Sequence, residues 1–247
     1  MNSGSSDQQQ LTNAVIITGG AQRVGKALAI ALAQQGFDVV ISYRTMKPAV
    51  TELRELGIHC QQADFSSQTG IDDFIGWINQ KCGSIRALIH NASDWLAESA
   101  DVSPQQTMNQ MMQIHAMVPY QLNLALAELL QTSTQGDIIH LTDYVVKTGS
   151  KKHIAYAASK SALENMTKSF AALLAPKVKV NAIAPGLIMF NEHDDERYRE
   201  KAKRKSLMAI EPGPQVVIDT INYIINNPYL TGSCVDLDGG RALASKQ

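Results

Sequence analysis

Short apolar runs rich in β-branched residues alternate with longer runs of helical periodicity along almost the entire chain. This alternation constrains the fold most, because parallel strands need crossover helices and those crossovers are right-handed. The expected strands lie at residues 14–18, 38–43, 58–64, 85–90, 137–142, 178–184 and 234–239. The expected helices lie from Pro48 onward and at residues 23–36, 69–81, 104–130, 153–175 and 214–226. The pattern predicts an α/β fold built on one doubly wound parallel sheet of about seven strands, with helices on both faces.

The chain of 247 residues is expected to form a single domain. Its hydrophobic fraction of 45% is enough for one sizeable core, and no linker rich in Pro, Gly or Ser divides it. The N-terminal sequence MNSGSSDQQQ is polar and resembles neither a secretory signal nor a transit peptide. We expect a disordered tail at residues 1–12 and one domain at residues 13–247.

Charge and cysteine content argue against several kinds of partner. The net charge is −1, so no basic field favours nucleic acid or anionic lipid. No run approaches the roughly 18 apolar residues of a membrane span. The cysteines Cys60, Cys82 and Cys234 are scattered without metal-ligand spacing, which predicts no metal site and a reducing compartment. We therefore expect a soluble cytoplasmic protein.

The first expected strand runs into TGGAQRVG, residues 18–25. A glycine-rich turn between a strand and a helix lets backbone N–H groups approach a diphosphate, and the helix N-terminus offers it partial positive charge. A lone glycine-rich turn is weak evidence. This one opens the first strand–helix–strand unit of the chain, which is the context that a dinucleotide site requires.

The end of the second expected strand distinguishes between the two nicotinamide cofactors. Strands that bind NAD usually end in Asp or Glu, which holds the ribose 2′-hydroxyl, whereas this strand ends SYRT with Ser42 and Arg44. A hydroxyl and a guanidinium suit a 2′-phosphate, so we expect NADPH as the cofactor. The alternative is that Arg44 is an ordinary surface charge. Arg23 adds a second cation inside the turn.

Tyr156 and Lys160 are four residues apart in an Ala-rich run, so a helix places them on one face. A nearby ammonium favours the phenolate form of tyrosine, whose pKa is ordinarily about 10. The pair is therefore a candidate proton donor for a carbonyl or imine that receives a hydride. Asp143 stands upstream of the pair, and its spacing leaves open whether the carboxylate belongs to the site or to a turn.

Together these motifs resemble the short-chain dehydrogenase/reductase family. The resemblance spans about residues 13–243 and rests on TGGAQRVG, HNAS (90–93), YAASK (156–160), NAIAPG (181–186) and LDGG (237–240). It implies a Rossmann-type domain, a nicotinamide cofactor and, as the commonest assembly, a homotetramer. It also implies a set of cofactor-binding residues: Thr18, Gly19, Arg23, Val24, Gly25, Ser42, Tyr43, Arg44, Asp64, Asn91, Ala92, Ser93, Tyr156, Lys160, Pro185, Gly186 and Ile188.

Two positions depart from most family members, which carry Ser where this chain has Asp143 and Asn where it has His115. The pteridine reductases of the family resemble this chain at Asp143, at Arg23 and at the aromatic Trp95 after the N-A-S motif. The resemblance implies a dihydropterin substrate that contacts Arg23, Ser93, Trp95, Asp143 and Tyr156. His115 is left open between a packed, hydrogen-bonded histidine and a group that organises a water chain.

The implied reaction is the NADPH-dependent reduction of a 7,8-dihydropterin to its tetrahydro form. Hydride passes from the nicotinamide to C6, and N5 gains a proton from Tyr156, directly or through water. Lys160 would bind the nicotinamide ribose and lower the pKa of Tyr156, while Asp143 would relay a proton or hold Tyr156 in place. Trp95 would stack on the pterin unless it is simple packing. The pterin side chain, whether that of monapterin, biopterin or folate, is left open.

Two other classes of function stay open. A reductase of 3-oxoacyl thioesters or small ketones is expected to carry Ser at position 143. A non-catalytic NADP(H)-binding sensor would not need the intact Tyr156 and Lys160 pair. The charged segment at residues 190–206 is expected to be a solvated helix face, a mobile lid or both, with residues 188–210 closing over the substrate.

Overall fold

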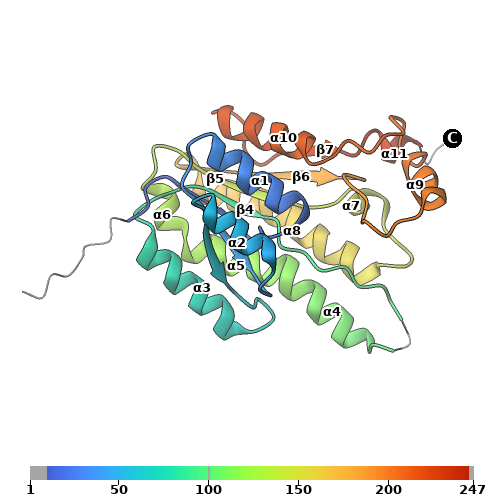
Figure 1. The fold of residues 1–247 in the computed structure, drawn as a ribbon, viewed down its shortest axis with the longest axis horizontal. Coiled ribbons are helices and arrows are strands. Elements are labelled where there is room, and N and C mark those ends of the chain that lie inside the picture. The colour runs from blue at the N-terminus through green and yellow to red at the C-terminus, as the bar shows by residue number, and fades with distance from the viewer. Residues whose placement is uncertain (1–9, 100, 245–247) are drawn as a thin grey trace, which may run out of the picture.

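The computed structural model describes residues 10–99 and 101–244 of the chain. Its centre is a seven-stranded sheet in the order β3-β2-β1-β4-β5-β6-β7, in which every neighbouring pair is parallel (Figure 1). The strands are β1 (Ala14–Ile17), β2 (Val39–Tyr43), β3 (His59–Gln62), β4 (Ile85–His90), β5 (Gly136–Leu141), β6 (Val178–Pro185) and β7 (Cys234–Leu237). The predicted doubly wound sheet is confirmed.

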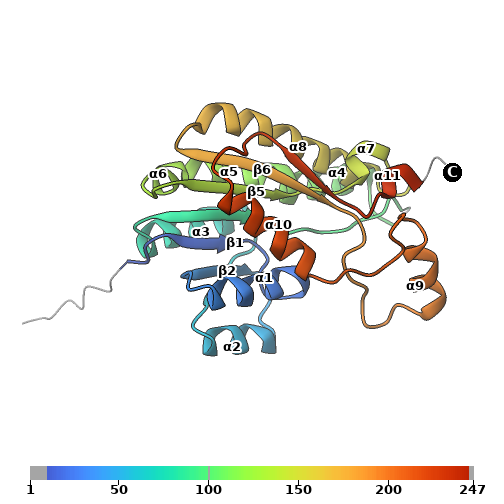
Figure 2. The same cartoon turned by 90° about the horizontal axis from the view of Figure 1, so that it is seen from above.

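Helices cover both faces of this sheet. Figure 2 shows α1, α2 and α10 on one side and α3, α5 and α8 on the other. The helices are α1 (Arg23–Gln34), α2 (Pro48–Glu55), α3 (Gln68–Lys81), α4 (Pro104–Met112), α5 (Val118–Ala125), α6 (Ala127–Gln131), α7 (Val145–Thr148), α8 (Ile154–Leu174), α9 (Glu196–Lys203), α10 (Gln215–Asn226) and α11 (Arg241–Ala244).

The core lies on both faces of the strands because successive side chains of a strand point in opposite directions. In β1, Val15 and Ile17 pack into the cluster beneath α1 and α10. Ala14 and Ile16 pack into the cluster beneath α3, α5 and α8. All four side chains are fully buried. A strand that is apolar on both faces, rather than alternating, is what a sheet covered on both sides requires.

The helix expected at residues 104–130 is interrupted, and here the prediction was wrong. A π-helical turn, η1 (Gln113–Met117), separates α4 from α5, and a further break at Leu126 separates α5 from α6. Pro119 in the first turn of α5 supplies a physical reason, because proline has no N–H to donate to the carbonyl four residues earlier.

Two further segments complete the description. The charged run at residues 190–206 contains the short helix α9, which buries Ala202 and exposes Glu196, Arg197, Tyr198 and Lys201, as expected of a helix with one solvated face. Of the tail expected at residues 1–12, residues 1–9 lie outside the described part of the chain. Leu11 forms an isolated parallel bridge with Cys82. Between residues 10 and 244, residue 100 aside, no helix is long and apolar enough to cross a membrane.

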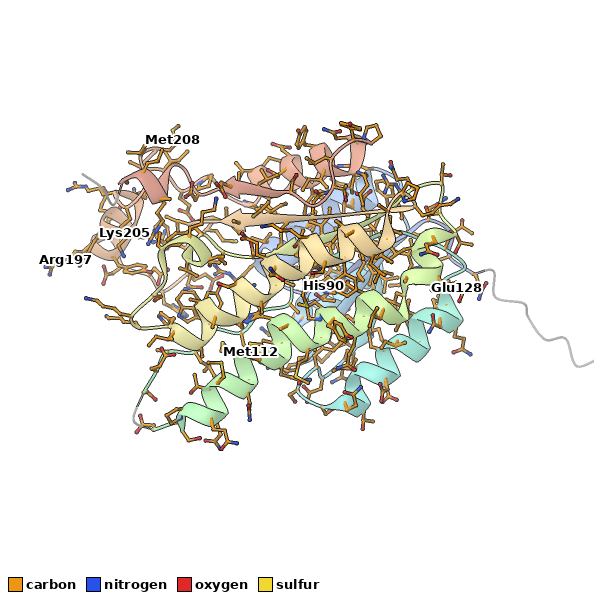
Figure 3. The ribbon with its side chains drawn as sticks, turned by 180° about the vertical axis from the view of Figure 1, so that it is seen from behind. His90, Met112, Glu128, Arg197, Lys205 and Met208 are labelled. Carbon is orange, nitrogen blue, oxygen red and sulfur yellow. The ribbon has the colours of Figure 1, made fainter. Side chains whose placement is uncertain are left out.

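The sheet order locates the functional edge. After β1 the chain moves outward to β2 and β3, and then returns to the other side of β1 with β4. Ligands of open α/β sheets bind at the carboxyl ends of strands where the order reverses in this way. Figures 1 and 2 show α7, α9 and α11 gathered at one end of the sheet. Arg197, Lys205 and Met208 lie at that end and Glu128 at the opposite one (Figure 3).

Candidate active site

The glycine turn connects β1 to α1 and has no room for a side chain at Gly19 or Gly25. Gly19 has a φ of +65°, and a Cβ there would lie 2.8 Å from the Cα of Ala92. A Cβ on Gly25 would lie 2.6 Å from both the Nδ2 of Asn91 and the carbonyl oxygen of Gly19. Glycine at these two positions therefore lets the end of β1, the end of β4 and the start of α1 approach one another closely.

Asn91 and Thr18 hold the turn against the end of β4. The Nδ2 of Asn91 donates to the carbonyl oxygens of Thr18 at 3.0 Å and Gly19 at 2.9 Å. The hydroxyl oxygen of Thr18 accepts from the backbone N–H groups of Asn91 at 3.1 Å and Ala92 at 3.0 Å. These residues, expected to bind cofactor, thus also build the turn. The N-terminus of α1 has no side-chain cap, so its N–H groups fit a diphosphate.

A cavity of about 1040 Å³ opens beside this turn. Its walls come from the ends of β1, β2, β3 and β4 and from α4. Eleven of the expected cofactor residues line it: Gly19, Arg23, Val24, Gly25, Ser42, Tyr43, Arg44, Asp64, Asn91, Ala92 and Ser93. Thr18 lies beneath the turn, while the remaining expected residues lie further along the same sheet edge. The cavity fits the adenosine and diphosphate part of a dinucleotide.

At the end of β2, the two residues expected to bind the 2′-phosphate, Ser42 and Arg44, lie in different environments. Ser42 is buried, and its hydroxyl oxygen accepts from the backbone N–H of Gly19 at 3.0 Å, so it supports the turn. Arg44 is exposed at the cavity rim, 3.3 Å from Asp94. Lys47 also lines the cavity, and its Nζ lies 2.5 Å from the side-chain oxygen of Gln22. Lys47 is thus a second cation beside Arg44 at this cavity, and the sequence analysis did not include it.

Asp64, at the end of β3, is exposed at the adenosine side of the cavity. Its Oδ1 accepts from the backbone N–H of Ser66 at 3.1 Å. This hydrogen bond is the main cause of the lowered pKa of Asp64. The carboxylate is therefore charged and held at the rim, where it fits a hydrogen-bond donor such as an adenine amine.

The side chains of Tyr156 and Lys160 lie one turn apart on α8, and Asp143 faces them from the loop after β5. The hydroxyl of Tyr156 donates to the Oδ2 of Asp143 at 2.9 Å. The other carboxylate oxygen, Oδ1, accepts from the backbone N–H of Val145 at 2.9 Å. The two sequence alternatives for Asp143 are therefore both present, since one oxygen closes a turn and the other contacts the tyrosine.

Burial controls the protonation of these groups. It raises the pKa of Asp143, against the lowering effect of the Val145 and Tyr156 hydrogen bonds. Burial, followed by the Asp143 carboxylate, raises the pKa of Tyr156 well above its usual value. Burial lowers the pKa of Lys160 to about 8, and its Nζ donates to the carbonyl oxygen of Leu141 at 2.8 Å. The expected lowering of the Tyr156 pKa by Lys160 is not what the structure gives, so Tyr156 holds its proton at neutral pH.

Trp95 forms one wall beside the tyrosine. Its ring centroid lies 4.6 Å from that of Tyr156 and 4.2 Å from that of His153. Even so, 58% of Trp95 is exposed. The tryptophan therefore packs on its neighbours and still presents a large surface on which a flat ring can stack.

His115 lies behind Tyr156, on η1. It is buried, and each ring nitrogen contacts a hydroxyl: Nε2 lies 2.8 Å from the Oγ of Ser93 and Nδ1 lies 2.9 Å from the Oγ of Ser159. Burial, and to a lesser extent the charge of Lys160, lowers the pKa of His115 to about 2. The imidazole is therefore neutral and hydrogen-bonded, which agrees with the first of the two readings of this residue.

Arg23 joins the glycine turn to the segment after β6. Its φ is +51°, a conformation in which glycine is commoner. Its guanidinium donates to the carbonyl oxygen of Met189 at 2.9 Å and to the side chain of Asn191. These hydrogen bonds hold residues 189–191, which follow β6, against the glycine turn that follows β1. This contact brings part of the expected closing segment, residues 188–210, to the cofactor side of the site.

The other residues expected near the nicotinamide lie where β6 ends. The carbonyl of Pro185 accepts from Tyr144 at 3.1 Å, and the N–H of Gly186 donates to Leu237 at 3.0 Å. Ile188 is buried. Arg241 was not anticipated, and its guanidinium lies 4.2 Å from the centre of the Tyr144 ring. No cluster of three or more potential metal ligands occurs in the described part of the chain.

A doubly wound sheet with a glycine turn at its switch point, and a tyrosine–lysine pair on helix α8 at the same end of the sheet, defines a nucleotide-binding α/β oxidoreductase. The family model described as short chain dehydrogenase matches residues 13–201. The chain belongs to this family.

The chain is 54% identical to a dihydromonapterin reductase of Klebsiella pneumoniae over 95% of this chain and 99% of that one. It is 53% identical to a dihydromonapterin reductase of an Enterobacter species over 93% and 96% of the two chains. Among solved structures, the FolM alternative dihydrofolate reductase 1 from Brucella suis in complex with NADP superposes with a TM-score of 0.83 at 28% identity, covering 94% of this chain and 96% of that one.

Proposed function

We propose that the chain is an NADPH-dependent reductase that converts 7,8-dihydropterins, dihydromonapterin foremost, to their tetrahydro forms. The observation that carries the proposal is the hydrogen bond from Tyr156 to Asp143 at 2.9 Å. Asp143 stands where most family members place a serine, and it is a half-buried acceptor beside the proton donor. The names of the relatives at 54% and 53% identity and of the NADP-bound FolM structure support the same substrate class and cofactor.

The residues of the cavity suit NADPH in particular. Arg44 and Lys47 supply positive charge at the rim for the 2′-phosphate. The bare turn at Gly19 and Gly25 takes the diphosphate, and Lys160 binds the nicotinamide ribose with its N–H groups. When bound, NADPH supplies the hydride that reduces C6 of the pterin.

Tyr156 supplies the proton. Because its pKa is raised, it stays protonated at neutral pH and gives its proton only when N5 becomes basic as C6 is reduced. Asp143 accepts the Tyr156 hydrogen in the structure, and the hydroxyl rotates from Asp143 to N5 when it gives its proton. Asp143 also accepts from an N–H of the pterin edge. A carboxylate is an acceptor and suits a ring rich in N–H groups, whereas the carbonyl oxygen of a ketone needs a donor.

NADPH oxidation with 7,8-dihydromonapterin tests the proposal, with 7,8-dihydrofolate and a small ketone as comparison substrates. We expect turnover with the dihydropterins, and a fall in kcat of about 100-fold in Asp143→Ser, the size of a general acid–base contribution. Asp73→Ser is the matched control, because Asp73 is exposed on α3. Unchanged turnover in Asp143→Ser would return Asp143 to a structural role. A wild type that binds NADPH without oxidising it on any dihydropterin would favour a sensor, and turnover on the ketone alone a ketone reductase.

We also propose that the chain works as a cytoplasmic homotetramer with a single domain at residues 13–247. Exposed Met117, Tyr120 and Leu124 on and beside α5 support an interface between copies. All three cysteines are free, as suits a reducing compartment. Light scattering on the eluting protein measures the assembly directly, and a monomeric mass would contradict the tetramer.

A further inference from the structure

His115 joins two serines from different parts of the chain. Ser93 follows β4, Ser159 lies on α8, and His115 stands between them on η1 with 1% of its surface exposed. Its ring is edge-on to Tyr156 at 5.3 Å between centroids, with an angle of 88° between the planes. A π-helical turn frequently marks a functional position inside a longer helix. The imidazole therefore contacts Ser93, which lines the cavity, and through Ser159 it is linked to the backbone carbonyl of Tyr156.

The direction of each hydrogen bond in this chain can be assigned. A serine hydroxyl has one hydrogen, and that of Ser159 is donated to the carbonyl oxygen of Tyr156 at 2.8 Å. Ser159 must therefore accept from the Nδ1–H of His115. Because the imidazole is neutral, its Nε2 carries no hydrogen and accepts from the hydroxyl of Ser93.

The directions of these hydrogen bonds decide whether the Ser93 hydroxyl acts as a donor or as an acceptor towards a ligand. His115 Nε2, at 2.8 Å, is a nearer acceptor for the Ser93 hydrogen than the carbonyl oxygen of Asp94 at 3.4 Å, so the oxygen lone pairs of Ser93 are what remain for the cavity that it lines. A hydroxyl fixed in this state accepts hydrogen bonds, and a site with a fixed acceptor discriminates strongly in favour of ligands with an N–H. Asp143, on the other side of Tyr156, is also an acceptor.

We propose that His115 is a positioning residue that sets Ser93 as a hydrogen-bond acceptor for an N–H of the substrate ring, and so contributes to the preference for pterins over carbonyl compounds. The inference rests on the proposed function. It explains the departure at this position, since the amide of an asparagine can donate as well as accept and does not fix the Ser93 hydroxyl in one direction.

A double-mutant cycle tests this role. Removing the imidazole in His115→Phe is expected to raise KM for 7,8-dihydromonapterin about tenfold and to change kcat less than about threefold, the size of one lost oriented hydrogen bond. Ser93→Ala is expected to raise KM similarly. The double variant should be no worse than Ser93→Ala alone, because His115 acts through Ser93. His59→Phe on the edge strand β3 is the matched control and should leave KM unchanged.

Additive effects in the double variant, or an effect on kcat and melting temperature without one on KM, would overturn the proposal while leaving dihydropterin turnover by the wild type intact. Nitrogen-15 NMR of the histidine rings supplies a readout that needs no turnover. The His115 signals, assigned by their absence in His115→Phe, should show the neutral Nδ1–H form from pH 5 to 8. An Nε2–H form or an imidazolium in that range would overturn the assignment of Ser93 as an acceptor.

Discussion

The two halves of the site are built by different means. Around the cofactor cavity the backbone does most of the positioning, with glycines brought against Ala92 and Asn91 at distances that exclude a side chain. Around Tyr156 the positioning comes from side chains, through Asp143 on one side and His115 with its two serines on the other. In the first half, a larger side chain at Gly19 or Gly25 would displace the backbone. In the second half, a side chain can be exchanged for one of different chemistry while the fold is kept. The departures from the family at positions 143 and 115 both fall in the second half.

The largest expected effect is a loss of turnover, without a loss of NADPH binding, on removal of the Tyr156 hydroxyl. Tyr156→Phe removes the proton donor and leaves the ring that packs against Trp95 and His115. We expect kcat to fall by about 1000-fold, within the range of general acid–base catalysis, while NADPH binding, measured by fluorescence titration, stays within about twofold. A comparable loss of NADPH affinity would mean that the two halves are not independent.

A smaller effect, on NADPH affinity, is expected when the glycine turn beside the cofactor cavity is changed, and a pair of glycine-to-alanine variants tests it. Gly25→Ala places a methyl group 2.6 Å from the Asn91 amide, so the turn must shift. We expect NADPH affinity to fall by about 10- to 100-fold, the usual range for overpacking expressed as binding. Gly76→Ala on α3 meets no atom within 4 Å.

That second variant is the control, with unchanged affinity and slightly higher stability because alanine favours a helix. Circular dichroism checks that both variants are folded. Equal affinities in the two alanine variants would contradict the account of the turn.

A third prediction concerns acid stability, which should depend on buried side chains and not on the turn. Burial lowers the pKa of His90 to about 4, that of His115 to about 2, and that of His140 well below its usual value. Below about pH 6.5 an unfolded chain protonates these histidines and the folded chain does not. Their contribution to stability is therefore complete above pH 6.5 and is lost as the pH falls towards 4.

Each such histidine contributes up to about 1.4 kcal/mol per pH unit in that window. Asp143 and Asp137, whose pKa values burial raises, act in the opposite direction nearer pH 4. Urea unfolding at pH 7.5, 6.0 and 5.0 measures the slope. A free energy of unfolding that does not change across these values would show that the histidines are not neutral in the folded chain.

The sequence predicted the parts of the molecule that depend on spacing. The seven strands, the glycine turn and the approach of Tyr156 to Lys160 follow from periodicities that the sheet and helix impose. The short helices α7 and α11 were not expected, because four residues are too few to show a helical period. The π-helical turn was missed because it keeps the apolar pattern of a helix and changes only the hydrogen bonding.

Side-chain direction was the least predictable property. The hydroxyl of Ser42 turned inward to Gly19, and the pKa of Tyr156 rose instead of falling. The depth of burial decided both, and burial depends on which segments meet in three dimensions. For the same reason no local pattern places Lys47, just before α2, or Arg241, at the start of the four-residue helix α11, near the site.

The hydrogen bonds from Asn91 to the glycine turn also bear on the order of events during synthesis. Asn91 and Thr18 are separated by 73 residues, and β1 is flanked by β2 on one side and by β4 on the other. The turn leaves the ribosome before β4, and it is incomplete until β4 has been made and has paired with β1. Contacts so distant in sequence slow folding, and β1 keeps one unpaired edge until β4 has been made, which leaves it open to aggregation in that interval.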